Sequence, residues 1–136
     1  MANFRVSEAA ALLGVSDDTV RRWSEAGRLT LRKEHGRSVI SGVELASLAQ
    51  ELAADSALST AFPSSRASAR NRITGIVTMV AKDGVMAQVD MQAGPFRIVS
   101  LMSREAAEEL GLEPGSLVTA SVKATNVVIE IPEAHP

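Results

Sequence analysis

Residues 68–77 have the sequence SARNRITGIV, and the fold and the site predicted for the C-terminal half of the chain begin with them. The first four of them offer a hydroxyl, backbone N–H groups, a guanidinium and a side-chain amide, all of which donate hydrogen bonds. No acidic side chain lies among them. A group of donors without acceptors suits a small, fully deprotonated oxyanion. The apolar residues that follow predict a strand that begins where the polar tetrapeptide ends.

Short apolar segments continue from this stretch at close spacing. One short helix is predicted over residues 103–110, with Ser103 as its N-cap and Gly111 as the residue that ends it. Gly84 and Pro114–Gly115 mark turns. The predicted strands are residues 73–80, 85–91, 96–101, 116–123 and 127–131. Short strands with one small helix predict a compact OB-like β-barrel, which the last strand closes.

The elements of this half occur in the order and at the spacing of a known family. They are Ser68–Asn71, Gly75, Gly84, Leu110–Leu112, Pro114–Gly115 and Val122–Thr125. With them the chain resembles the Mop (molbindin, or TOBE) family of molybdate-binding domains over residues 68–131. The resemblance implies that the domain holds molybdate or tungstate where subunits meet.

The same resemblance implies which residues would bind the oxyanion. They come from the tetrapeptide, from the start of the small helix and from a Lys-Ala-Thr segment: Ser68, Ala69, Arg70, Asn71, Ser103, Lys123, Ala124 and Thr125. Arginine, lysine and N–H groups at a helix start all suit a dianion. Some family members have a second hydroxyl three residues after the one that starts the helix, and this chain has Ala106 there.

Two short helices are predicted in the N-terminal half. Ser7 is the predicted N-cap of the first, which Gly14 ends, and Ser16 is the predicted N-cap of the second, which Gly27 ends. Two short helices joined by a tight turn form a helix-turn-helix. In the second helix, residues 16–26, Val20 and Trp23 are expected to face the core.

A basic hairpin follows the second helix. Residues 29–32 and 37–40 are the predicted strands, and the tip between them contains Lys33, Glu34, His35 and Gly36. A hairpin in this place is a wing, which can lie along a groove of DNA and contact phosphates. Ser41–Glu44 is a predicted capping box that opens a third helix, which continues to about Ala54.

These features resemble the MerR and excisionase class of winged helix-turn-helix DNA-binding domains, over residues 4–54. By that resemblance the second helix enters the major groove and residues 32–37 form the wing. The residues expected to face double-stranded DNA are Ser16, Asp18, Thr19, Arg21, Arg22, Arg32, Lys33, His35 and Arg37.

Composition supports two unlike halves. The net charge of the 136 residues is −2, but residues 21–37 contain six Arg and Lys against two Glu, whereas residues 73–136 contain four Arg and Lys against eight acids.

The predicted fold class is α+β: a winged helix-turn-helix domain (1–54), a linker rich in Ser and Ala (55–67) and a Mop/TOBE barrel (68–136). No cysteine is present, the only histidines are His35 and His135, and no set of catalytic residues is found, so an enzyme is not expected.

The sequence therefore predicts a transcriptional regulator that responds to molybdate or tungstate. Two alternatives stay open: a molybdate storage or buffering protein, and an architectural DNA-binding protein whose barrel only oligomerises. Because Mop sites form between domains and the chain has one, a single subunit cannot complete a site, so a dimer or a dimer-based hexamer is expected. With no signal peptide and no membrane span in the sequence, the expected location is cytoplasmic.

Overall fold

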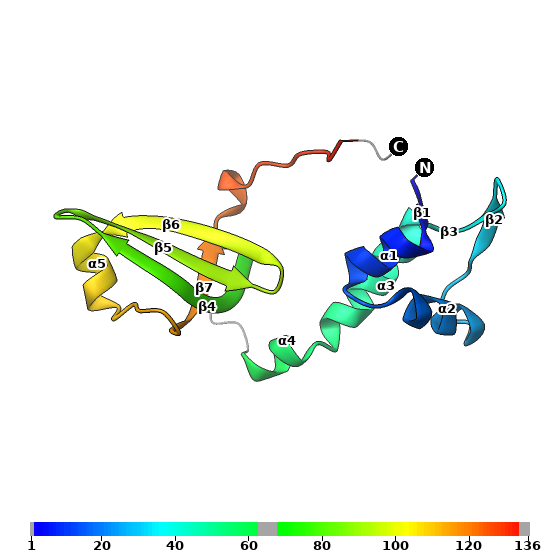
Figure 1. Cartoon of the computed structure of the whole chain (residues 1–136), viewed down its shortest axis with the longest axis horizontal. Helices are drawn as coiled ribbons and strands as arrows, with labels where there is room; N and C mark the ends of the chain where they lie inside the picture. The colour runs from blue at the N-terminus through cyan, green and yellow to red at the C-terminus, as the bar shows by residue number, and fades with distance from the viewer. Residues whose placement is uncertain (1, 63–67, 134–136) are drawn as a thin grey trace. The chain divides into compact units, whose positions relative to one another are not determined.

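The computed structural model describes residues 2–62 and 68–133 of the chain. It divides into two compact units, Met1–Pro63 and Ser64–Pro136. Residues 63–67 of the predicted linker and His135 lie outside the described residues. The structure mixes helices and strands in both units (Figure 1), so the predicted α+β class is confirmed.

The N-terminal unit combines four helices, the last of them short, with a small antiparallel sheet. In chain order it contains β1 (Asn3–Arg5), α1 (Val6–Leu13), α2 (Asp17–Glu25), β2 (Arg32–Glu34), β3 (Arg37–Ser41), α3 (Gly42–Ala54) and the short α4 (Ala57–Ala61). The sheet order is β1-β3-β2, so the wing β2–β3 is extended by a strand from the start of the chain. The strand β1 was not predicted from the sequence.

The helix-turn-helix forms because both helices end and begin on residues suited to those positions. Gly14 adopts the left-handed conformation with φ of 72°, and the Ser16 hydroxyl accepts the N–H of Thr19 at 3.1 Å. The predicted cap at Ser7 is wrong: α1 begins at Val6, after Arg5, whose N–H donates to the Glu8 carboxylate at 3.0 Å. Because β1 runs directly into α1, the helix begins earlier than the serine indicated.

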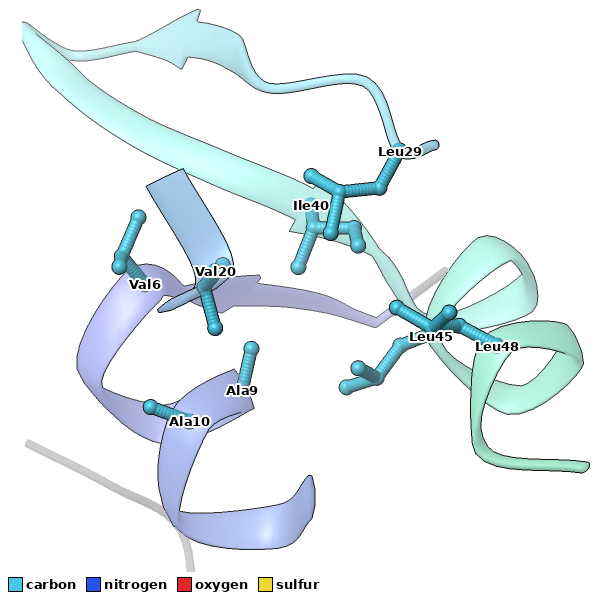
Figure 2. Close-up of a cluster of buried hydrophobic side chains, with 8 residues drawn as sticks. All are labelled: Val6, Ala9, Ala10, Val20, Leu29, Ile40, Leu45 and Leu48. Carbon is cyan, nitrogen blue, oxygen red and sulfur yellow. The ribbon is translucent and has the colours of Figure 1, made fainter. Parts of the chain in front are cut away.

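An aliphatic cluster joins α1, α2, β3 and α3 into one core (Figure 2). Val20 and Ile40 are fully buried in it, and Trp23 packs against it, which confirms the predicted inward face of α2. The buried members are Val6, Ala9, Ala10, Val20, Leu29, Ile40, Leu45 and Leu48. Leu29 belongs to this core rather than to the first wing strand, which begins only at Arg32.

The wing turns tightly at its tip. His35 and Gly36 both have positive φ, 51° and 79°, as the two central residues of a type I′ hairpin turn do. At the other end of β3, Ser41 caps α3 by accepting the N–H of Glu44 at 3.2 Å. The predicted capping box is only half formed, because the Glu44 carboxylate accepts the N–H of Thr30 at 2.6 Å instead.

The C-terminal unit is a curled antiparallel sheet with one small helix at its end (Figure 1). It contains β4 (Asn71–Lys82), β5 (Met86–Ala93), β6 (Phe96–Ser103), α5 (Arg104–Glu109), β7 (Leu117–Val122) and the 3₁₀ turn η1 (Ala124–Asn126). The strand order is β6-β5-β4-β7. A bulge between Val77 and Met79 bends β4 where it leaves β7 for β5.

The predicted closing strand, residues 127–131, is wrong for the described chain. This segment pairs with no strand, and Val128, Ile129 and Ile131 are 83%, 84% and 93% exposed. The unit is therefore a half-barrel, with an apolar hollow of about 300 Å³ between β5, β6 and β7. Alternating apolar residues predict a strand, but they do not specify which sheet edge accepts it.

Close packing between β4 and β5 depends on the absence of a side chain at Gly75. A Cβ built there would overlap with the carbonyl oxygen of Gln92 and lie 3.0 Å from Cε of Met91.

The carboxylate of Asp90 on β5 is buried and fully bonded. Asp90 is only 6% exposed and accepts hydrogen bonds from Arg97 at 2.9 and 2.6 Å and from Gln88 at 3.0 Å. These bonds, chiefly those of Gln88 and then Arg97, hold the pKa of the Asp90 carboxyl below its ordinary value.

Gly75→Ala is expected to destabilise the C-terminal unit by about 1–3 kcal/mol, because the added methyl pushes β4 away from β5. Differential scanning calorimetry of the full chain measures the effect. Gly84→Ala is the matched control: nothing lies within 4 Å of its Cβ position, so a change of less than about 0.5 kcal/mol is expected. Equal melting of the two variants would contradict the close approach at Gly75.

Candidate functional site

The pairing of β4 with β7 brings two of the predicted oxyanion-binding segments together. Asn71 lies opposite Val122, and its side-chain amide donates to the carbonyl of Val122 at 3.1 Å. Residues 68–70, just before Asn71, therefore lie beside residues 123–125, just after Val122. Seven of the eight predicted residues, those of 68–71 and 123–125, thus share one end of the sheet.

This end of the sheet is rich in donors and has no acid. Arg70 and Lys123 are exposed, as are the hydroxyl-bearing Ser68 and Thr125. No Asp or Glu occurs in residues 68–76 or 117–126, and no aromatic residue does either. Two cations and two hydroxyls on exposed residues are groups that can donate hydrogen bonds to an anion.

Ser103, the eighth predicted residue, lies elsewhere. It is opposite Met86 at the far end of β5, whereas Asn71 begins β4 at the other end of the sheet (Figure 1). The length of β4 between these ends is about 35 Å for a straight strand. One chain therefore does not bring Ser103 to Ser68–Asn71.

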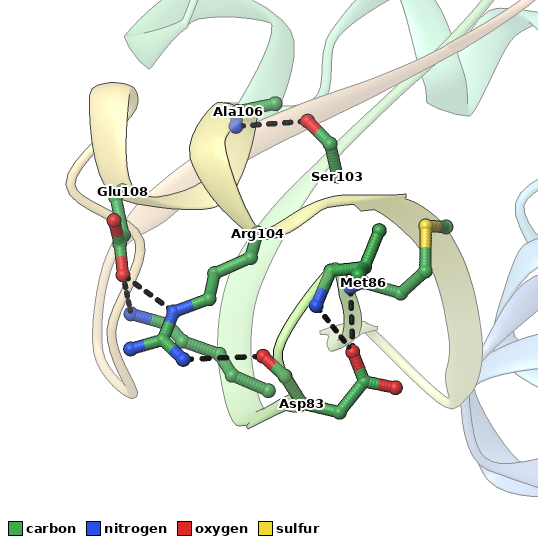
Figure 3. Close-up of polar contacts among 8 residues, drawn as sticks. Asp83, Met86, Ser103, Arg104, Ala106 and Glu108 are labelled. Carbon is green, nitrogen blue, oxygen red and sulfur yellow. Dashed lines mark hydrogen bonds and ion pairs between the residues drawn. The ribbon is translucent and has the colours of Figure 1, made fainter.

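The local role of Ser103 is to cap α5. Its Oγ accepts the N–H of Ala106 at 3.0 Å (Figure 3), and a hydroxyl used in this way retains its own O–H for donation. Ala106, which replaces the second hydroxyl of some family members, thus contributes its N–H to the cap and not to a ligand.

A charged network fixes the start of α5 beside the β4–β5 turn (Figure 3). Arg104 donates from Nε to Glu108 at 2.8 Å and from Nη1 to the carbonyl of Asp83 at 3.2 Å, and Lys82 lies 4.0 Å from the same Glu108 carboxylate. The hydrogen bond and charge of Arg104 lower the pKa of Glu108. The network places Ser103 firmly at this corner. The i,i+4 spacing of Arg104 and Glu108 in the sequence could have predicted this ion pair.

The Asp83 side chain holds the turn itself. Its carboxylate accepts the N–H groups of Val85 and Met86 at 2.8 and 2.7 Å. These bonds, first that of Met86 and then that of Val85, lower the pKa of Asp83.

On the helix-turn-helix unit, four predicted DNA-facing residues are bonded to one another along α2. Thr19 shares a 2.9 Å hydroxyl contact with Ser16 and accepts from Arg22 at 3.1 Å, while Arg22 lies 3.4 Å from the carboxylate of Asp18. Ser16 acts as the helix cap. The exposed Arg22 is therefore held in a defined orientation on the outer surface of α2.

Three other predicted residues, Arg21, Lys33 and Arg37, line one polar hollow of about 440 Å³ between α2 and the wing. Arg5 and Ser7 line it too, and both were missed from the sequence because the strand β1 was not recognised. The remaining lining residues are Val6, Asp17 and Ser38. Arg32 lies outside the hollow, with Nη2 donating to Asn3 at 3.4 Å, and His35 is exposed at the wing tip.

Residues 2–62 and 68–133 contain no group of three or more His, Cys, Asp or Glu side chains placed to hold a metal ion. None of the helices in these ranges has the length and apolar character that crossing a membrane requires.

Comparisons with known proteins match both units. A model of the helix-turn-helix domain family matches residues 4–53, and a model of the TOBE domain family matches residues 67–129. Both resemblances found in the sequence are thereby confirmed.

Relatives of the second unit are small proteins. Molybdenum-pterin-binding protein 2 of Clostridium pasteurianum is 43% identical over 63 residues, which are 46% of this chain and 93% of that protein, and molybdenum-pterin-binding protein 1 is 40% identical over the same share.

Two solved structures are similar over their whole chains. A molybdate binding protein from Sporomusa ovata is 31% identical, with a TM-score of 0.48 over 49% of this chain. MopII from Clostridium pasteurianum is 39% identical, with a TM-score of 0.46 over 48%.

The family assignment rests on the family models and on the curated relatives, nearly the full length of which this chain covers. Through its TOBE domain, which follows a helix-turn-helix domain, the chain belongs to the family of the molybdenum-pterin-binding proteins.

Proposed function

We propose that this protein is a DNA-binding regulator of transcription that responds to molybdate or tungstate. The observation that carries the proposal is the presence in one chain of a helix-turn-helix unit with exposed cations and a TOBE domain with Arg70 and Lys123 at one end of its sheet. A module that binds DNA and a module that binds a small ligand together make a ligand-dependent switch. In this function the protein binds and does not catalyse, and it acts in the cytoplasm, in contact with DNA.

A bare oxyanion suits the site better than the pterin in the relatives' name. The flat ring of a pterin gains additional stabilisation where it can stack on an aromatic side chain. Residues 68–76 and 117–126 contain no aromatic side chain, whereas they provide cations, hydroxyls and N–H groups. The proposed ligands are therefore molybdate and tungstate. The proposed binding residues are the eight predicted ones, Ser68–Asn71, Ser103 and Lys123–Thr125.

The separation of Ser103 from the other residues supports a site shared between copies of the chain. Because Ser103 is at the opposite end of β4 from Asn71, it can join Arg70 and Lys123 only from a second subunit. The smallest assembly that meets this condition is a dimer, and a dimer-based hexamer meets it as well. Ser103 retains an O–H for the ligand while it caps α5.

The exposed C-terminal segment supports the same assembly. Val128, Ile129 and Ile131 lie in water, next in the chain to a half-barrel with an apolar hollow and an unpaired β7 edge. Burial of three aliphatic side chains is worth about 1.5–3 kcal/mol for each. We assign this segment to the hollow of a second copy, where it completes the barrel.

Substitution of the two cations should weaken oxyanion binding. Arg70→Ala and Lys123→Ala each remove a charge-assisted hydrogen bond, so we expect about 1.5–3 kcal/mol less binding free energy for molybdate. Isothermal titration calorimetry measures it. Lys33→Ala makes the same charge change on the other unit and should leave the affinity unchanged; an equal loss there would mean that only net charge matters.

The same titration tests the chemistry of the site against other anions. Phosphate is partly protonated near neutral pH and presents an O–H for which the site has no acceptor, so it should bind far more weakly than tungstate. Sulfate is fully ionised and only its smaller size can disfavour it. Competition by phosphate as strong as that by tungstate would rule out a site made of donors alone.

Arg21→Ala or Arg22→Ala should weaken binding to a preferred duplex by about 1–3 kcal/mol if the residue contacts a base edge. The probe is a duplex selected from random-sequence DNA, and fluorescence anisotropy reads the affinity. Lys33→Ala should instead weaken binding to all duplexes equally. DNA affinity that none of the three changes alters would contradict the assigned DNA-binding face.

Placing a charge in the exposed segment should break the assembly. Ile129→Asp should turn the dimer or hexamer into monomers in sedimentation velocity and abolish molybdate binding. Leu12→Asp is the control, because Leu12, like Ile129, is a largely exposed aliphatic residue but lies on α1 of the other unit. A wild-type protein that is monomeric, yet binds one molybdate per chain, would refute the shared site.

The alternatives give different results in these assays. A storage protein binds molybdate tightly without selecting a DNA sequence. An architectural protein binds DNA with an affinity that molybdate does not change. The proposed regulator does both, and its DNA affinity depends on the oxyanion.

A further inference from the structure

We propose that the polar hollow of the helix-turn-helix unit receives one phosphate group of the DNA backbone, and that Arg5 and Ser7 help to bind it. The inference rests on the proposed function and deepens it, because it adds a phosphate site formed by the first residues of the chain to the contacts of α2 and the wing. A contact of this kind is an electrostatic contact to the DNA backbone, and it is independent of base sequence.

The charge around the hollow is strongly unbalanced. Four cations line it, from four elements: Arg5 of β1, Arg21 of α2, Lys33 of β2 and Arg37 of β3. Asp17 is the only acid in the lining. Among the described residues, Arg21, Lys33 and Arg37 take part in no ion pair. Cations gathered without partners repel one another, and an anion seated between them removes that repulsion.

Arg5 is placed to contact such an anion. It is the residue before α1, and its N–H and its Nε both bind the Glu8 carboxylate, at 3.0 and 3.5 Å. The Nε contact is long, and 43% of the Arg5 side chain is exposed. Glu8 therefore holds chiefly the backbone at the start of α1 and does not enclose the guanidinium, which keeps the planar geometry that suits two oxygens of one phosphate.

Ser7 adds a neutral donor at the same place. Its hydroxyl is exposed, and it lies in the first turn of α1. The four cations supply most of the attraction for the phosphate, and the Ser7 hydroxyl adds one directional hydrogen bond. A tetrahedral oxyanion uses both kinds of donor, since charge gives attraction and the hydroxyl bonds to a single oxygen.

Duplex DNA is the source of phosphate that the surroundings favour. The hollow is not an isolated cluster, because the exposed Arg22, Arg32 and His35 continue the basic surface on α2 and the wing. A free phosphate ion would use one set of donors, whereas a polyanion uses cations spread over a surface. A phosphate held between β1, α2 and the wing would also set the position of α2 along the groove.

The test compares Arg5→Ala with Arg5→Lys and Glu8→Gln in the full chain. The probe is a duplex of about 20 base pairs with random sequence, titrated at several salt concentrations. Loss of one phosphate contact should flatten the slope of log K against log salt by about 0.9 in Arg5→Ala, and Arg5→Lys should restore most of it. Glu8→Gln keeps an oxygen for the N–H of Arg5 but removes the charge, so its slope should equal that of the wild type.

Three results would overturn the inference. The first is an Arg5→Ala slope equal to the wild-type slope. The second is a Glu8→Gln slope as flat as that of Arg5→Ala, which would show that Arg5 acts only by holding the start of α1. The third is displacement of DNA by inorganic phosphate beyond that by chloride at equal ionic strength, in the wild type but not in Arg5→Ala, which would make the hollow a site for the free ion.

The outcome separates this inference from the proposed function. A wild-type protein that binds no duplex at low salt would overturn both. A wild-type protein that binds DNA, with Arg21→Ala and Lys33→Ala weakened as expected and Arg5→Ala unchanged, would overturn only the site at Arg5. Circular dichroism of each variant verifies that the helices are retained.

Discussion

The strand β4 pairs with two neighbours in succession, with β7 from Asn71 to Ile76 and with β5 from Ile76 to Lys82. The bulge that follows Val77 is where it changes partners and where the sheet bends. This single strand therefore determines both the curl of the half-barrel and the end at which the segments proposed to bind the oxyanion meet. A slip of one residue between β4 and β7 would turn every side chain of one strand to the other face. Gly75, which is the next-to-last β4 residue in the pairing with β7, permits the close approach to β5 as well.

Much of the fold could be predicted because it is encoded over a few adjacent residues. Gly14 and Ser16 specify the turn of the helix-turn-helix by their own backbone and side-chain preferences, without help from distant residues. The six family elements of the second half likewise keep a fixed order along the chain. The start of β4 could be placed to within two residues on this basis.

The parts that could not be predicted all depend on partners far away in sequence. The strand β1 has only three residues and no period, and it exists because β3 offers it an edge. For the same reason Arg5 and Ser7 did not enter the predicted DNA-binding set. Residues 127–131 have the right composition for a strand, yet they pair with no strand among the described residues, although the outer edge of β7 is free. The sequence also could not predict which of the eight predicted oxyanion-binding residues lie together in one chain. The position of Ser103 follows from the order of the strands in the sheet and not from its spacing along the sequence.

The proposed assembly, which would cover the apolar arm formed by Val128, Ile129 and Ile131, also links the state of the protein to its abundance. Val128, Ile129 and Ile131 are held in water for as long as a chain is alone, and the half-barrel beside them is open. Association obeys mass action, so in the proposed assembly dilution favours the lone form and a high concentration of copies favours the covered form. An extended apolar arm is also a good substrate for proteases and a template for aggregation. In that assembly the lifetime of the protein in a cell would depend on its rate of synthesis, because lone chains expose the arm to proteases and associated chains cover it.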